Sequence, residues 1–219
     1  MLMKSVPFKH IYMKIQPADI LKIEVPTLPT GYSYRFSQAG DAKNWAVLEL
    51  AVGEFETLEA ALARYESEFL PGGDRYQKLQ ATFVIPKEAL SQRQIFIESP
   101  QGEVVATATA WMGIKDGLYQ PMLHWVSVSP KAQGLGLGRA VVAKAMSLFP
   151  TLDPEQTVML HSQTWSYPAV VLYHKLGFYL CKTEGFRLDN DFHNGLAEVL
   201  QTVISEPTFS NLMAEARES

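Results

Sequence analysis

A glycine-rich segment joins an apolar run to a helix-forming run in the second half of the chain. Its glycines stand at alternate positions, Gly134, Gly136 and Gly138, between a strand-like run that ends at Pro130 and the run 139–149. Glycine lets backbone N–H groups converge on a bulky anion, and a helix start adds unpaired N–H groups and a positive dipole end. We therefore predict a phosphate-binding loop, with a turn that only reverses the chain as the alternative.

The spacing of this segment excludes two common nucleotide-binding loops. A nucleoside triphosphate loop requires a lysine after its last glycine, and Gly138 is followed by Arg139. The dinucleotide fingerprint, counted from Gly134, also ends at Arg139 instead of at glycine or alanine. The segment instead reads Gln-x-x-Gly-x-Gly, from Gln133 through Gly136 to Gly138. This pattern resembles the acetyl-CoA-binding motif of the GCN5-related N-acetyltransferases, the GNAT superfamily.

A second motif makes the resemblance specific. Five residues fit the pattern A-x-x-L-Y-x-x-x-G-F: Ala169, Leu172, Tyr173, Gly177 and Phe178. This pattern resembles the next element of the family, a short helix, for which the glycine is a natural C-cap. The two motifs stand in the family's order with a predicted strand, 157–163, between them. The resemblance covers roughly residues 32–183.

The resemblance implies both a fold and a reaction. The fold is α/β, with a mixed, mainly antiparallel central sheet flanked by helices on both faces. The reaction is direct transfer of an acetyl group from acetyl-CoA, as co-substrate and without a metal, to a primary amine of a small molecule or peptide. Such a transfer needs a neutral amine, a stabilised oxyanion and a proton for the leaving thiolate. The alternative is a catalytically weak acetyl-CoA-binding sensor or interaction module.

Tyr173 and His124 are the candidates for proton transfer. Tyr173 occupies the motif position where many relatives place the tyrosine that protonates the thiolate, and the alternative is a packing aromatic. In the superfamily the base usually comes from the strand before the glycine loop, which here carries His124, a residue type that titrates near neutral pH. A packing role for His124 is equally open. No histidine stands at a spacing from Cys181 that is typical of a catalytic cysteine–histidine pair, so we do not expect Cys181 to be a nucleophile.

The acetyl-CoA contacts are assigned to one strand and the loop after it. Backbone groups of Val126 and Val128 are expected to bond the pantetheine amides as a neighbouring strand would. Regular alternation would place His124, Val126 and Val128 on one face of that strand. The pyrophosphate is assigned to the loop residues Gln133, Gly134, Gly136, Gly138 and Arg139, although an exposed arginine that solvates the helix end is the alternative for Arg139.

The acceptor residues are the least defined by the sequence. In this fold the acceptor groove is expected between the first two helices, their loop 53–56 and the residues 161–165. Glu54 suits a cationic amine, and Trp165 could line an aromatic pocket or belong to the core. Polyamines, amino acids, aminoglycosides and protein amino termini all remain open as acceptors.

Periodicity and chain breakers predict the elements that position these residues. The predicted order is strand, two helices, three strands, helix, strand, helix, strand, which describes an α/β domain. We divide the chain into residues 1–30, an N-terminal arm or extra strand, residues 31–186, the acetyltransferase domain, and residues 187–219. The last segment is expected to be partly helical and to pack on the same domain.

Composition limits the partners. The chain has 219 residues, 47% of them hydrophobic, and a net charge of −4, which gives no basic footprint for nucleic acid. No apolar run approaches the ~20 residues of a membrane span, and the start lacks the apolar core of a signal peptide. A single cysteine fits a reducing compartment. We therefore expect a cytoplasmic protein with an amine as partner, neither nucleic acid nor membrane, and a homodimer left open.

Overall fold

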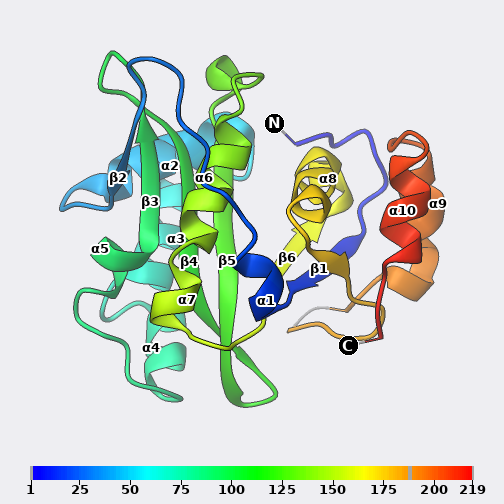
Figure 1. The fold of residues 1–219 in the computed structure, drawn as a ribbon. Coiled ribbons are helices and arrows are strands. Elements are labelled where there is room, and N and C mark those ends of the chain that lie inside the picture. The colour runs from blue at the N-terminus through cyan, green and yellow to red at the C-terminus, as the bar shows by residue number, and fades with distance from the viewer. Residues whose placement is uncertain (1, 187–188, 219) are drawn as a thin grey trace.

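The computed structural model describes residues 2–186 and 189–218, which form one sheet with helices on both faces (Figure 1). The strands follow the order β2-β3-β4-β5-β6-β1-β7 across the sheet. Their bounds are β1 His10–Ile15, β2 Ser33–Phe36, β3 Gln94–Glu98, β4 Val104–Lys115, β5 Leu118–Val128, β6 Val158–Gln163 and β7 Tyr179–Leu180. Neighbouring strands are antiparallel except β5 and β6, which are parallel. The predicted mixed, mainly antiparallel sheet is confirmed.

Helices cover both faces of the sheet. Their bounds are α1 Pro17–Ile20, α2 Asp41–Val52, α3 Leu58–Phe69, α4 Asp74–Gln80, α5 Ala89–Arg93, α6 Leu137–Met146, α7 Phe149–Leu152, α8 Tyr167–Lys175, α9 Ala197–Gln201 and α10 Thr208–Ala214. In Figure 1, α2 and α3 lie behind the sheet, whereas α6 and α8 lie in front of it. None of the helices in the described part of the chain is both long and apolar enough to cross a membrane.

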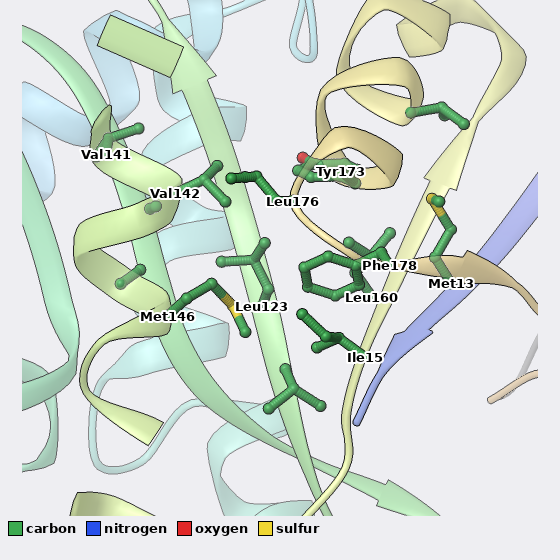
Figure 2. Packing of buried hydrophobic residues seen from close by; sticks show 14 of the residues in the cluster. Met13, Ile15, Leu123, Val141, Val142, Met146, Leu160, Tyr173, Leu176 and Phe178 are labelled. Atoms are coloured by element: carbon green, nitrogen blue, oxygen red, sulfur yellow. The ribbon is translucent and has the colours of Figure 1, made fainter. Parts of the chain in front are cut away.

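Two hydrophobic clusters hold these layers together. The cluster on the α6 and α8 side includes Leu123 of β5 and Met146 of α6. Figure 2 shows its side chains between these two helices and the strands. The cluster on the other side is aromatic, with Trp45 of α2 and Phe69 of α3 packed against the sheet residue Trp111. Both clusters bury large apolar surfaces, which is the main favourable contribution to folding.

The N-terminal segment supplies a strand inside the sheet. For residues 1–30 the sequence left open an arm or an extra strand, and β1 lies between β6 and β7, antiparallel to both. Met13 pairs with Leu160 on one side and with Leu180 on the other. Every residue of β1 after His10 is buried.

The C-terminal segment packs on the same body. Leu200 of α9 and Leu212 of α10 are fully buried in the cluster around α8, and Cys181 forms a β-bridge with Arg217. The boundary predicted at residues 186 and 187 adjoins residues 187–188, which lie outside the described residues.

Several element boundaries differ from the predicted ones. The predicted helix 139–149 begins earlier, at Leu137, and α6 ends at Met146, before a separate α7 that carries Pro150 in its first turn. Helices α4 and α5 occupy a stretch that the sequence analysis left unassigned. The strands β4 and β5 extend to a tight hairpin, where Asp116 and Gly117 take positive φ values of 52° and 79°.

Candidate active site

A bulge in β5 determines which side chains reach each face of the sheet. The pairing of β4 with β5 shifts between Thr107 and Thr109, and Trp125 has a positive φ of 47°. An extra residue at this point inverts the alternation, because the side-chain period of a strand is two. The expectation that His124 shares a face with Val126 and Val128 is therefore wrong.

The two faces of β5 serve different layers after this bulge. His124 contacts Glu68 of α3, and Trp125 packs on Trp45 of α2. Val126 and Val128 instead pack against the cluster that contains α6 and α8. The two sets of predicted residues thus lie on opposite faces of one strand.

The parallel strands β5 and β6 are paired at one position. Met122 faces Met159, and the strand register records no further pair between them in the described residues. Ser129 donates its N–H to Val105 of β4, so the backbone groups of the preceding residue, Val128, point away from β4. The end of β5 therefore offers backbone groups on the side of β6, as the pantetheine prediction requires.

The glycine loop follows directly and begins helix α6. Gly134 and Gly136 have φ values of 81° and 77°, the left-handed region that glycine adopts without strain. Gly136 is the N-cap and no side chain caps the helix, so the N–H groups of the first turn stay available to an anion. Gly138 lies inside the first turn, where an added Cβ would be 3.6 Å from Leu172 of α8.

Two side chains of the loop were predicted to contact the pyrophosphate. Gln133 donates a hydrogen bond from Nε2 to the Val128 carbonyl at 3.4 Å, which closes the loop onto the end of β5. Arg139 is exposed at the third position of α6. An arginine in that place can pair with an anion held by the helix N-terminus.

Tyr173 projects from α8 toward β5. Figure 2 shows its hydroxyl directed from the helix to the side on which Leu123 lies. The ring packs near Phe178, with 5.9 Å between the centroids, and only 6% of the residue is exposed. Burial and, to a smaller extent, the nearby Glu49 raise the pKa of the phenol. The hydroxyl therefore stays protonated and can act as a donor.

His124 forms a pair with a buried carboxylate that the sequence analysis did not find. Its Nε2 lies 3.1 Å from Glu68 Oε1, and Arg75 Nη1 lies 3.4 Å from Glu68 Oε2. Burial by itself would raise the pKa of Glu68, but the charge and hydrogen bond of His124, with the nearby arginines, lower it. Glu68 is thus an ionised partner that orients the imidazole.

Glu49 of α2 is the second carboxylate that the sequence analysis missed. It is completely buried and accepts a hydrogen bond from Ser127 Oγ at 2.8 Å, and burial raises its pKa to about 8. Its Oε1 atom is buried without a hydrogen-bond partner among the described residues, as are Nε1 of Trp45 and of Trp125. The helical spacing could have indicated this position: Glu49 follows the core residue Trp45 by four residues, about one turn, and so lies on the same buried face of the helix.

The two predicted acceptor residues lie near the N-terminal segment. Trp165 donates its Nε1–H to the Val6 carbonyl at 2.8 Å. Glu54 is exposed beside Lys4 and Gln163, and its pKa is raised because surrounding protein desolvates the carboxylate. A cavity lies beside His124, and its described lining includes neither Glu54 nor Trp165.

Cys181 is a poor candidate for a nucleophile. Cys181 is buried, and burial raises the pKa of its thiol to about 12, which keeps it protonated and a poor nucleophile. No group of three or more candidate metal ligands occurs within residues 2–186 and 189–218.

The chain combines a mixed α/β sheet with a glycine loop that begins helix α6. The model of the acetyltransferase (GNAT) family matches residues 56–178, more than half of the chain, and the chain belongs to this family. A comparison with curated proteins finds no match.

Solved structures of similar fold include proteins of the same family. The GCN5-related N-acetyltransferase from Sphaerobacter thermophilus has a TM-score of 0.55 and 19% identity, with 80% of this chain and 49% of that chain covered. A functionally unknown conserved protein from Staphylococcus epidermidis has a TM-score of 0.52 and 10% identity, with 81% and 61% covered. A tandem GNAT protein from the clavulanic acid biosynthesis pathway has a TM-score of 0.52 and 14% identity, with 81% and 51% covered. The chain thus spans about half to three-fifths of these structures, and the likeness shows the fold alone.

Proposed function

We propose that the chain is an N-acetyltransferase that moves an acetyl group from acetyl-CoA directly to a primary amine of a small molecule or peptide. The observation that carries this proposal is that β5 and β6 pair at one position among the described residues, Met122 with Met159, two residues before His124. A thioester placed after this point lies along the free edge of β5, with its pyrophosphate at the helix that Gly136 caps. His124 and Tyr173 approach that edge from opposite faces of the sheet.

Acetyl-CoA binding is assigned mainly to backbone groups. The exposed edge at Val126 and Val128 bonds the pantetheine amides, and the N–H groups of the loop and first helical turn bind the pyrophosphate. Gln133 holds the loop against the strand end, and Arg139 supplies a positive charge beside the phosphates. Such binding explains why the cofactor leaves few diagnostic side chains in the sequence.

The transfer requires that the amine lose protons and that the thiolate gain one. His124, oriented by Glu68, accepts a proton from the ammonium form of the acceptor, and the neutral nitrogen attacks the thioester carbonyl carbon. A C–N bond forms, the C–S bond breaks, and its electron pair leaves with sulfur. The Tyr173 hydroxyl donates its proton to the leaving thiolate. The nitrogen, which is positively charged once the C–N bond has formed, loses a second proton that reprotonates Tyr173, and the first proton passes from His124 to solvent. The products are the acetylated amine and free coenzyme A.

Glu49 is a second candidate for the base. It is a carboxyl group with a pKa of about 8 next to the bulge at Trp125, and its unpartnered oxygen can take a hydrogen bond from an ordered water. If Glu49 accepts the proton, the rate rises with pH up to about 8, and Glu49→Gln removes this rise. If His124 accepts the proton, Glu49→Gln leaves the profile in place and His124→Gln changes it.

The test of the proposed function is thiol release from acetyl-CoA with a panel of primary amines. Release above the rate of hydrolysis, with the acetylated amine detected by mass spectrometry, supports the enzyme. Binding of acetyl-CoA without transfer to any class of amine supports the sensor or interaction module instead.

A further inference from the structure

A cavity of about 240 Å³ lies beside His124, between the sheet and the helices α3 and α4. Most of its lining is apolar and comes from α4, the β4–β5 hairpin, β1 and the segment after β7. The apolar lining residues are Leu79, Met112, Ile114, Met122 and Phe186, and Tyr12 adds an aromatic ring with a hydroxyl. The cavity therefore favours an apolar or aromatic group over a hydroxylated one, because buried hydroxyls without partners are costly.

The charged groups of the cavity gather at one carboxylate. Glu68 is the carboxylate among the described lining residues, with His124 at 3.1 Å and Arg75 at 3.4 Å. Burial lowers the pKa of His161 to about 4, and its Nε2 lies 3.0 Å from Nδ1 of His10. His161 is therefore neutral at neutral pH. Glu68 is the one negative charge that the described lining offers to an ammonium group, and Arg75 is its positive neighbour.

The cavity is unfavourable for a ligand that carries two ammonium groups. The half-exposed Arg75 already pairs with Glu68, and a second ammonium would find a guanidinium where it needs a carboxylate. The cavity is also smaller than the ~300–1,000 Å³ of sites for drug-sized ligands. The first observation argues against polyamines as the occupant, and both observations argue against aminoglycosides.

From this cavity we infer that the acceptor is a small primary monoamine with one compact apolar or aromatic group. The apolar lining holds that group, while Glu68 and His124 meet the amine beside the thioester. The inference rests on the proposed function and names its substrate class.

The experiment compares three amines in the thiol-release assay with saturating acetyl-CoA. The probes are 2-phenylethylamine, a compact aromatic monoamine, putrescine, a dication, and glucosamine, a hydroxylated monoamine. We expect kcat/KM for 2-phenylethylamine to exceed the other two values about tenfold or more. A higher value for putrescine or glucosamine overturns the inference but leaves the proposed function standing.

A charge placed in the cavity provides a second test. Ile114→Glu adds a carboxylate to the lining and should shift the ratio of kcat/KM toward putrescine by about tenfold or more. Leu118→Glu is the matched control, because it makes the same change on an exposed residue of the same hairpin. An unchanged ratio in a folded Ile114→Glu protein overturns the inference, and if this variant does not fold, the comparison of amines on the wild type decides.

Calorimetric titration of 2-phenylethylamine into the protein with coenzyme A separates the two proposals. Binding without thiol release supports this cavity assignment and counts against the proposed function. Failure of 2-phenylethylamine to bind, when another amine supports thiol release from acetyl-CoA, overturns the assignment alone.

Discussion

His124 Nε2 and Glu68 Oε1 lie 3.1 Å apart, although the two residues are separated by 56 positions in the chain. The pair joins helix α3 to β5 where β5 and β6 part, so it fixes an imidazole next to the proposed path of the thioester. A second histidine–glutamate pair, His174 with Glu215, has the same 3.1 Å separation but connects α8 to the C-terminal end of α10. The two pairs differ in their surroundings, which allows a controlled test.

The first prediction concerns His124 as the base. His124→Gln should lower kcat by ~10²–10⁴-fold, because glutamine preserves much of the shape but cannot accept the proton. The dissociation constant for acetyl-CoA should change little. His174→Gln removes the matched pair and should leave kcat near the wild-type value. Equal kcat values for all three proteins, with the chemical step limiting, would assign His124 to packing.

The second prediction concerns the glycine loop. Gly136→Asp should abolish the rise in melting temperature that acetyl-CoA causes through linkage, because its carboxylate would repel the pyrophosphate. Gly102→Asp is the control: its φ of 78° matches the 77° of Gly136, and neither glycine has a neighbour within 4 Å of an added Cβ. Both variants therefore carry similar backbone strain. A normal acetyl-CoA shift in Gly136→Asp would place the phosphates elsewhere.

Local sequence signals predicted the parts of the site that depend on the backbone. Gly134 and Gly136 adopt the left-handed conformations that their residue type permits, and Tyr173 lies on the helix that its motif indicates. These features depend on short-range geometry, which a sequence pattern records directly. The mixed sheet with helices on both faces could be predicted from the order of the elements and from the family resemblance that these motifs carry.

The parts that depend on register and long-range contact could not be predicted. The bulge at Trp125 inverts the faces of β5, and no glycine or proline at that residue marks it. Glu49 and Glu68 resemble ordinary helical glutamates until their helices pack on the strand. The position of β1 inside the sheet depends on a pairing across more than 140 residues, which periodicity does not report.

The third prediction concerns Tyr173 as the donor to the thiolate. Tyr173→Phe should lower kcat by ~10²-fold or more while acetyl-CoA binding stays nearly intact, because only the hydroxyl is lost. Tyr179→Phe is the control, since it removes a hydroxyl that accepts a hydrogen bond from Gln16 away from the glycine loop. If both variants turn over at the wild-type rate, the role of Tyr173 is to pack α8 against the sheet.

The last prediction concerns the stability of the fold at different pH values. Burial raises the pKa of Glu49 from 4.5 to about 8, so between these values the folded protein holds a proton that the unfolded chain releases. The free energy of unfolding should therefore fall as pH rises from about 5 to about 8, by about 1.4 kcal/mol for each pKa unit of the shift.

Glu49→Gln cannot titrate and should not show this loss, so its stability relative to wild type should increase steadily from pH 5 to pH 8. Urea denaturation at several pH values measures the difference, and Glu59→Gln, which removes an exposed carboxyl of α3, is the control. Parallel pH profiles for wild type and Glu49→Gln would show that the carboxyl is already ionised in the folded state. Its unpartnered oxygen would then need a cation or water network to stabilise the charge, and Glu49 could no longer serve as a base with a pKa of about 8.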